Sequence, residues 1–253
     1  MITIKEVKDP WFNLRQNLYK NAEPLVELLG ITTMFETEQD LFDFIRGQTE
    51  ESRNVPIITP DRIPGHVASM SHMSEKTPEG EVKLTKNLLK MKPVPHLGPF
   101  EFMQWVFKIQ GVSKSCLTQF DRHRIGAGFV QMSKRYMDAN RTGYVYETLG
   151  YLDDIVVVED LLNASAAHSK ASDELYNYFI SKGATKEDAR KRLPVNMATG
   201  TWVHLNTTSL RHFFTLRLDS HAEWEIRRMA NLMYTSAQKI APAHFTNLIE
   251  GVE

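Results

Sequence analysis

Cationic side chains are concentrated in one short stretch of this sequence, residues 119–136, which read QFDRHRIGAGFVQMSKRY. Arginine binds phosphate and carboxylate oxygens through two parallel hydrogen bonds, so this stretch suits an anionic ligand. Arg122 and Arg124 lie two positions apart near a predicted helix end, where their side chains diverge. They can therefore hold two anions or two parts of one cofactor. The alternative is a solvated face, because helix C-termini favour cations and charge runs are usually exposed.

A second group of arginines lies near polar residues in the C-terminal half. Arg211 and His212 interrupt an otherwise apolar helical pattern. A buried arginine costs free energy unless it is paired, so the pattern indicates an anion pocket. Internal ion pairing explains it equally well, with Asp188, Asp219 or Glu225 as the acids. The other members of the group are Arg190, Arg192, Arg217, Asn206, His221 and Glu223.

Several common reaction chemistries lack the residues that they need. The single cysteine, Cys116, falls on the apolar face of a predicted helix, where a thiol is usually inert. His66, His72 and His96 have no metal-ligand spacing, so no metal site is expected. Ser133 has no nucleophile-elbow context. Phosphate-binding loops of the Walker and Rossmann types are also absent, so a bound dinucleotide would not lie in a Rossmann unit.

Composition bounds the class of protein. The 253 residues suffice for one large domain or two small ones. Lys and Arg number 30 against 31 Asp and Glu, a net charge of -1 that argues against a nucleic-acid binder. One cysteine favours a reducing, cytoplasmic compartment. The N-terminus does not resemble a signal peptide, and no run approaches the roughly 18 apolar residues of a membrane span, so no membrane partner is expected.

The elements that must position these residues can be read from the hydrophobic pattern. Residues 100–111, FEFMQWVFKIQG, alternate between apolar and polar side chains from Met103 to Gln110, which predicts a strand with one buried face and an end at Gly111. Ser113 can cap the next helix, which carries Arg122, His123 and Arg124 at its C-terminal end. Two glycines disfavour a helix over 125–132, so a loop is expected there, with SKRY on a new element.

The rest of the chain predicts a mixture dominated by helices. We expect a strand over 1–7, helices over 11–30 and 37–48, mostly loop over 54–83, and a long helix closing at Gly183. Further on, we expect a short helix after Thr185, a strand over 201–206, and a helix over 209–218 with Leu216 inward. A capping box of Ser220 and Glu223 should open the last helix. The predicted fold class is α+β, with a central, mostly antiparallel sheet flanked by long helices in a single domain over 1–253.

Three ordered motifs resemble those of the flavin-dependent thymidylate synthases. The first is the signature Arg122-His123-Arg124, a spacer, then Ser133-x-Arg135-Tyr136. Upstream, HLGPFE (residues 96–101) precedes a strand and the helix GVSKSCLTQF. Downstream, three further segments follow in the family's order: ARKRLP, LNTTSLRHFFTLRLDSHAEWEI and MANLMY. The resemblance covers residues 84–136 and 186–242, whereas residues 1–83 diverge.

The resemblance implies a reaction and a set of cofactors. The family converts dUMP to dTMP with methylenetetrahydrofolate as carbon donor, FAD as hydride carrier and NADPH as reductant. Its members are homotetramers whose active sites lie at subunit interfaces. All of these ligands are anionic, which would account for the clustered arginines. The family needs no cysteine nucleophile, in agreement with the position of Cys116.

The resemblance also implies roles for individual residues. Catalytic roles fall on Ser133, Arg217 and His96, with the Arg217 charge stabilising enolate character on the uracil and Ser133 hydrogen-bonding near the ring rather than attacking it. Cofactor binding falls on Arg122, His123, Arg124, Glu101, Asn206, His212 and His221. Substrate binding falls on Gln119, Gln131, Ser133, Arg135, Arg190 and Arg217.

Some positions depart from the family pattern. Eight residues separate Arg124 from Ser133 where seven are common, so that Ser133 is shifted or the extra residue forms a bulge. The family commonly has Thr or Ser at the position of Gly98, Glu at that of Gln131 and a basic residue at that of Thr208. Arg211 lies one helical turn from Thr208 and can supply that positive charge. Two alternatives follow: a related enzyme that hydroxymethylates dUMP or acts on dCMP, and a non-catalytic nucleotide- or RNA-binding relative.

Overall fold

The computed structural model describes residues 9–35, 37–46, 57–72 and 77–248. Its strands are β1 (Leu25–Ile31), β2 (Met34–Phe35), β3 (Ile57–Ile58), β4 (Gln104–Ser113), β5 (Ala127–Gln131) and β6 (Ala198–Asn206). Its helices are α1 (Phe12–Gln16), α2 (Glu38–Arg46), α3 (Ile63–His72), α4 (Pro78–Lys90), α5 (Lys114–Phe120), α6 (Ile155–Ser181), α7 (Lys186–Ala189), α8 (Thr207–Arg217) and α9 (Trp224–Ile240).

A four-stranded sheet in the order β1-β4-β6-β5 forms the centre of the molecule. Each neighbouring pair in it runs antiparallel. The alternation in β4 places Trp105, Phe107 and Ile109 on one face, where all three are fully buried. The predicted α+β class with a mostly antiparallel sheet is therefore confirmed.

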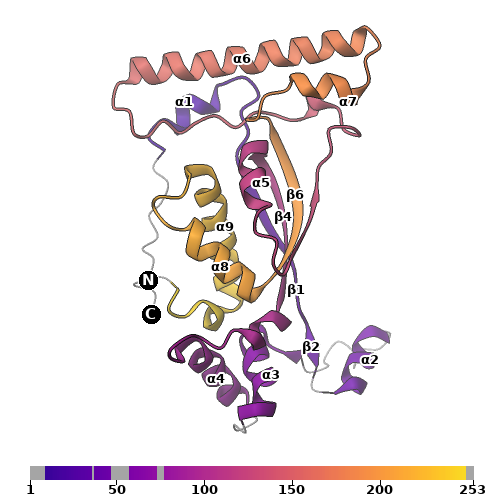
Figure 1. Cartoon of the computed structure of the whole chain (residues 1–253), viewed down its shortest axis with the longest axis vertical. Coiled ribbons are helices and arrows are strands. Elements are labelled where there is room, and N and C mark those ends of the chain that lie inside the picture. The colour runs from indigo at the N-terminus through magenta and orange to yellow at the C-terminus, as the bar shows by residue number, and fades with distance from the viewer. Residues whose placement is uncertain (1–8, 36, 47–56, 73–76, 249–253) are drawn as a thin grey trace.

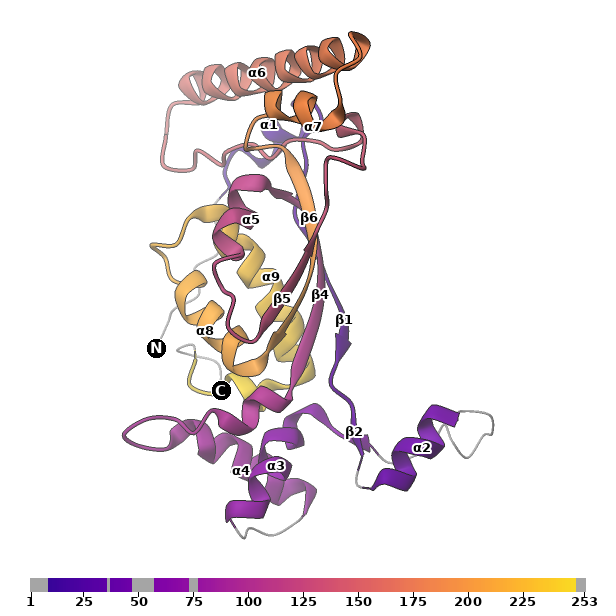
Figure 2. The same cartoon turned by 45° about the vertical axis from the view of Figure 1, so that its right-hand side comes forward.

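Helices α5, α8 and α9 cover the same face of this sheet (Figures 1 and 2). Their apolar sides supply Phe120, Phe213 and Phe214 to a core that they share with the strands. Tilted contacts join these rings, with centroids 4.9 Å apart for Phe120 and Phe213 and 5.7 Å apart for Phe213 and Phe214. The core therefore fixes the C-terminal end of α5 against α8, which matters for the site below.

The two ends of the sheet carry separate groups of helices. Helix α6 lies across one end, with α1 and α7 beneath it, and α3 and α4 pack at the other end (Figure 1). A second apolar cluster, which includes Tyr144, Tyr146 and Tyr176, joins α6 to the segment before it. This cluster connects α6 to the residues that follow the cationic signature.

Several local predictions are confirmed. Ser113 caps α5 by accepting a hydrogen bond from the Cys116 backbone N–H at 2.9 Å. The long helix α6 ends at Ser181, followed by Gly183 with a φ of 83°. Thr185 caps α7, with its hydroxyl 3.3 Å from the Asp188 N–H.

Two segments in the N-terminal third contradict their predictions. The expected helix over 11–30 is only α1, and β1 occupies its second half, where the short apolar run pairs with β4 instead. The expected loop over 54–83 contains α3 and the first six residues of α4. Pro64 and Pro78 lie at the first positions of these helices, where proline needs no backbone N–H partner, so they start helices rather than break them. The strand expected over 1–7 lies outside the described residues.

Five smaller predictions were also wrong. β4 continues past Gly111 to Ser113 through a register shift between Gln110 and Val112. The expected loop before Ser133 contains β5, and SKRY forms a turn. Leu216 is 44% exposed, and Glu223 rather than Ser220 caps α9 by accepting from the Ile226 N–H at 3.2 Å.

Glu225 gives the fold a testable pH dependence. It is buried beneath α5, where it accepts hydrogen bonds from the Ser113 backbone N–H and hydroxyl, both at 2.6 Å. Burial raises the pKa of Glu225 from 4.5 to about 7. The folded chain therefore binds this proton more tightly than the unfolded chain, and the contribution to stability is full below pH 4.5 and is lost as pH rises through 7.

We expect Glu225→Gln to remove this pH dependence. The difference in the free energy of unfolding between the native chain and the variant should fall by up to about 3 kcal/mol between pH 4.5 and 7.5. Urea denaturation at a series of pH values measures it. Subtracting the two curves cancels His123 and His244, whose lowered pKa values act in the opposite direction. Glu174→Gln, at an exposed position on α6, is the control. A pH-independent difference would contradict the expectation.

Candidate active site

The signature arginines lie at the edge of a cavity of about 510 Å³, which we call the arginine–histidine pocket. The α5–β5 connection forms one wall and α8 forms the other. Its lining residues are Pro95, Leu97, Arg122, His123, Arg124, Ile125, Thr208, Ser209, Arg211, His212, Thr215 and Leu248. The lining combines three arginines with apolar side chains and contains no acidic residue.

Backbone contacts fix the two walls relative to each other. Asn206 caps α8 by accepting from the Ser209 N–H at 2.8 Å, and its own N–H donates to the Gly126 carbonyl at 2.9 Å. Gly126 has a φ of +61°, and a Cβ there would lie 2.3 Å from the Asn206 side chain. The Ser209 hydroxyl donates to the Ile125 carbonyl. Asn206, predicted to bind a cofactor, thus holds the loop that shapes the pocket.

His123 is held neutral within this site. Arg217 Nε donates to His123 Nε2 at 3.1 Å, and the ring stands edge-on to Phe213 with centroids 5.0 Å apart. Burial, followed by the charges of Arg217 and His212, lowers the pKa of His123 to about 4. Because Nε2 accepts a hydrogen bond, the proton of the neutral ring lies on Nδ1, which makes that atom a donor.

Arg217→Met should raise the pKa of His123. The substitution removes the nearest positive charge but leaves the burial that is the larger cause of the shift. We therefore expect the pKa of His123 to rise yet stay below the usual value of about 6.5. An NMR titration of the ring protons measures it, with the exposed His221 as an internal control. An unchanged or lower pKa would contradict the assigned contact.

The buried arginine of α8 is not explained by internal ion pairing. Arg211 is 9% exposed, and its guanidinium donates to the His244 carbonyl. Burial lowers the pKa of Arg211 to about 10. The three acids considered as partners contact other groups: Asp188 pairs with Lys191, Asp219 with His221, and Glu225 with Ser113. These contacts favour the anion-pocket interpretation of the sequence pattern.

A second cationic cavity of about 440 Å³ contains the other half of the signature, and we call it the lysine–arginine pocket. The residues after β5 form one side, and the segment from Arg190 to Thr199 forms the other. Its lining residues are Lys114, Gln131, Met132, Ser133, Lys134, Arg190, Lys191, Leu193, Pro194, Met197 and Thr199. This lining has four cationic side chains and, again, no acidic residue.

Gln131 is fixed by hydrogen bonds on both ends of its amide. Its Nε2 donates to the Asp121 carboxylate, and its Oε1 accepts from Lys114 Nζ at 2.8 Å. These bonds join the end of β5 to both ends of α5. Gln131 therefore positions Lys114 at the pocket rather than presenting a free amide to it.

The two pockets lie at opposite ends of β5. Arg124 and Ile125 precede the strand, whereas Met132 and Ser133 follow it. A five-residue strand spans roughly 15 Å, at about 3.3 Å per residue. β5 pairs with β6 without a register shift, so the extra spacer residue is not a bulge within the strand. Within a single chain, Ser133 and the Arg122–Arg124 group therefore lie at opposite ends of β5 and do not form one site.

The structure places several predicted site residues outside both pockets. Glu101 is exposed, His96 neighbours Leu97 without lining the arginine–histidine pocket, and the His221 side chain is 93% exposed beside Asp219. Gln119 is half-buried on α5. Arg135 pairs with Glu187 at 3.6 Å. Their predicted roles remain predictions.

The pockets also contain residues that the sequence did not single out as ligands. These are chiefly Lys114, Lys134 and Lys191 in one pocket and the apolar Leu97 and Ile125 in the other. Lys134 lies within the signature, between Ser133 and Arg135, so the sequence shows its charge. The sequence does not show that its side chain points into the pocket. Lys114 was identifiable only as the residue after the Ser113 cap.

Other features of the described chain add no competing chemistry. Burial raises the pKa of the Cys116 thiol, which agrees with its predicted inert position. No group of three potential metal ligands occurs among the described residues. No described helix is long and apolar enough to span a membrane.

Comparison with known proteins gives a consistent set of relatives. The family model for thymidylate synthase complementing protein matches residues 56–243. A flavin-dependent thymidylate synthase of Clostridium tetani is 31% identical over 176 residues, which are 65% of this chain and 70% of that protein. The Pyrococcus furiosus protein of the same name is 34% identical over 156 residues, 62% of each chain. That of Geobacter sulfurreducens is 30% identical over 176 residues, 70% of this chain and 73% of that protein.

Proposed function

This chain belongs to the thymidylate synthase complementing protein family, and on that premise we propose that it is a flavin-dependent thymidylate synthase. The proposed reaction is the reductive methylation of dUMP to dTMP. Methylenetetrahydrofolate donates the carbon, and NADPH is the reductant. The observation that carries the proposal is the pair of acid-free cationic pockets, each built on one half of the family signature.

The arginine–histidine pocket suits a flavin dinucleotide by the chemistry of its lining. Arg122 and Arg124 would hold the diphosphate oxygens, since guanidinium groups bind phosphate bidentately. Leu97, Ile125 and Leu248 offer apolar surface for a ring system. Bound FAD supplies the hydride carrier that a methylene group needs to become a methyl group.

The residues of the chain have three separable tasks in this proposal. Arg217 places a fixed positive charge where negative charge develops on the uracil, which lowers the energy of that state. His123 stays neutral at pH 7, so it orients Arg217 without adding a proton source there. Ser133 and Arg190 would bind the nucleotide in the lysine–arginine pocket.

The position of Cys116 supports a route without a thiolate nucleophile. Its thiol is fully buried in the core between α5 and the sheet, with its pKa raised by that burial. A thiolate could form and reach the pyrimidine only if this core opened. Polarisation of the uracil by Arg217 together with flavin reduction avoids this need.

The separation of the pockets supports an active site completed between subunits. Ser133 and the Arg122–Arg124 group lie at opposite ends of β5, so one chain does not join them into one site. We therefore propose a homotetramer in which the arginine–histidine pocket of one subunit meets the lysine–arginine pocket of another. A cytoplasmic location accompanies this proposal.

An absorption spectrum of the purified protein tests the proposed function. We expect a flavin spectrum that bleaches with NADPH under anaerobic conditions, and faster when dUMP is present. Arg124→Met should weaken flavin retention, whereas the exposed Arg141→Met on the short turn after Asp138 should not. A protein that takes up no flavin, even after FAD is added, would rule the proposal out. A bleaching rate that dUMP does not change would favour a different nucleotide substrate, such as dCMP.

A further inference from the structure

Lys134 lines the lysine–arginine pocket, yet the roles discussed so far leave it unused. Its Nζ donates to the Thr142 hydroxyl at 2.7 Å and to the Ala198 carbonyl at 3.2 Å. An ammonium group has three N–H donors, so these two bonds hold it in place and leave one donor for a ligand. The acceptors come from β6 and from the turn after Asp138, so two separate segments of the chain fix the amine.

The charge of Lys134 lacks an adjacent carboxylate within the pocket. Burial lowers the pKa of Lys134 to about 8, and Asp173 of α6 acts against this shift from a greater distance. The other charged residues that line the pocket are the cations Lys114, Arg190 and Lys191, of which Lys191 pairs with Asp188 at 2.9 Å. An anion with two negative charges would therefore relieve both the burial of the ammonium and the repulsion among these side chains.

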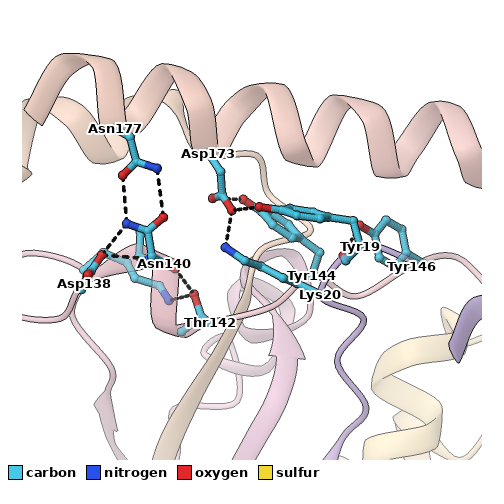
Figure 3. Close-up of polar contacts among 11 residues, drawn as sticks. Tyr19, Lys20, Asp138, Asn140, Thr142, Tyr144, Tyr146, Asp173 and Asn177 are labelled. Atoms are coloured by element: carbon cyan, nitrogen blue, oxygen red, sulfur yellow. Dashed lines mark hydrogen bonds and ion pairs between the residues drawn. The ribbon is translucent and has the colours of Figure 1, made fainter. Parts of the chain in front are cut away.

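A polar network under α6 fixes the acceptors of Lys134. Asp173 is 3% exposed and accepts from Tyr19, Lys20 and Tyr144 at 2.9, 2.6 and 2.5 Å. Figure 3 shows these contacts beside a second group in which Asn140 faces Asn177 and Thr142 lies just below. The two amides exchange hydrogen bonds at 2.9 and 3.1 Å. The turn that carries Thr142 is thus tied to α6 before any ligand binds.

We propose that Lys134 is a substrate-binding residue that contacts the phosphate group of the nucleotide in the lysine–arginine pocket, with Arg190 beside it. It makes this pocket select a nucleoside monophosphate over the free nucleoside. This proposal depends on the proposed function only for the identity of the nucleotide base. The contact between Lys134 and the phosphate does not depend on it, because dUMP and dCMP carry the same phosphate.

Calorimetric titration of the flavin-loaded, full-length protein tests the proposal. In Lys134→Met, the Kd of dUMP should rise by about 10- to 100-fold, the range expected for a lost charge-assisted hydrogen bond. The Kd of deoxyuridine, which has no phosphate, should stay the same. Lys170→Met, an exposed lysine of α6, is the matched control and should change neither value. Unchanged dUMP binding, or an equal loss of dUMP and deoxyuridine binding, would overturn the proposal.

Two further readouts separate phosphate binding from a purely structural role. Because burial lowers the pKa of the free amine to about 8, binding of dUMP at pH 8 should draw in protons in the native chain and fewer in Lys134→Met. Titrations in two buffers of different ionisation enthalpy measure this uptake. Thr142→Val removes one acceptor but keeps the charge, so it should lose less dUMP affinity than Lys134→Met. Equal losses, or equal proton uptake, would indicate that Lys134 only braces the turn.

The same titrations keep this proposal distinct from the proposed function. If the native chain binds dCMP but not dUMP, the proposed substrate is wrong, and the Lys134 comparison is made with dCMP and deoxycytidine. If it binds dUMP with no effect of Lys134→Met, the role of Lys134 is wrong and the proposed function is untouched. Binding of neither nucleotide would overturn both.

Discussion

Arg217→Met should lower the rate of dTMP formation by about 100- to 1,000-fold, with flavin still bound. A fixed charge aimed at developing negative charge stabilises the transition state far more than the ground state. Arg217 suits this task because its Nε–H is committed to His123 at 3.1 Å, which orients the guanidinium. Single-turnover oxidation of the reduced flavin in the presence of dUMP and methylenetetrahydrofolate measures the rate.

The control for this prediction is Arg141→Met, since Arg141 is an exposed arginine on the turn after Asp138 and takes no part in the contact between Arg217 and His123. It should leave the rate within about twofold of the native value, as expected for a surface substitution. The flavin spectrum of Arg217→Met should match that of the native protein, which separates catalysis from cofactor loss. A rate reduced less than tenfold would mean that Arg217 is not the group that stabilises the uracil.

Asp173→Ala should lower the free energy of unfolding by about 3–5 kcal/mol, the usual cost of removing one partner of a buried ion pair. The substitution leaves Lys20, Tyr19 and Tyr144 without their common acceptor. For a chain of this length, the melting temperature should fall by roughly 6–20 °C. Because this network fixes the turn that carries Thr142, dUMP affinity should also weaken.

Thermal and urea unfolding of three proteins measure this effect: the native chain, Asp173→Ala and Glu174→Ala. Glu174 is the next residue on α6 and is exposed, so its substitution should change stability by less than about 0.5 kcal/mol. Equal stability for the two variants would contradict the role assigned to Asp173. Lys20→Met should recover part of the loss in the Asp173→Ala background, because it removes the cation left unpaired.

The parts of the fold that the sequence predicts are those with a strong local pattern. β4 alternates from Gln104 to Gln110, and Ser113 stands where a cap is needed, so both follow from neighbouring residues alone. β1 cannot be predicted in this way, since its apolar run fits a helix as well as a strand. Only its pairing with β4 makes it a strand. The prolines of α3 and α4 mislead for a related reason: proline is common in the first turn of a helix, although it breaks a helix when it lies in the interior.

The candidate site is predictable in its residues but not in its arrangement. The signature identifies Arg122, His123, Arg124 and Ser133 by type and order. Their separation into two pockets depends on the spacer being extended, which two glycines alone do not determine. The direction of Lys134 depends on Thr142, eight residues away, and on the Ala198 carbonyl of β6, 64 residues away. The division of the site is therefore a tertiary property.

The mass of the nucleotide product tests the central claim most directly. The flavin-loaded protein is supplied with dUMP, methylenetetrahydrofolate and NADPH under anaerobic conditions, and the nucleotides are then separated and weighed by mass spectrometry. The account predicts a product heavier than dUMP by one CH₂ group, formed only when flavin is bound. A product heavier by one CH₂O group, a reaction with dCMP alone, or no reaction in a flavin-loaded protein would contradict it.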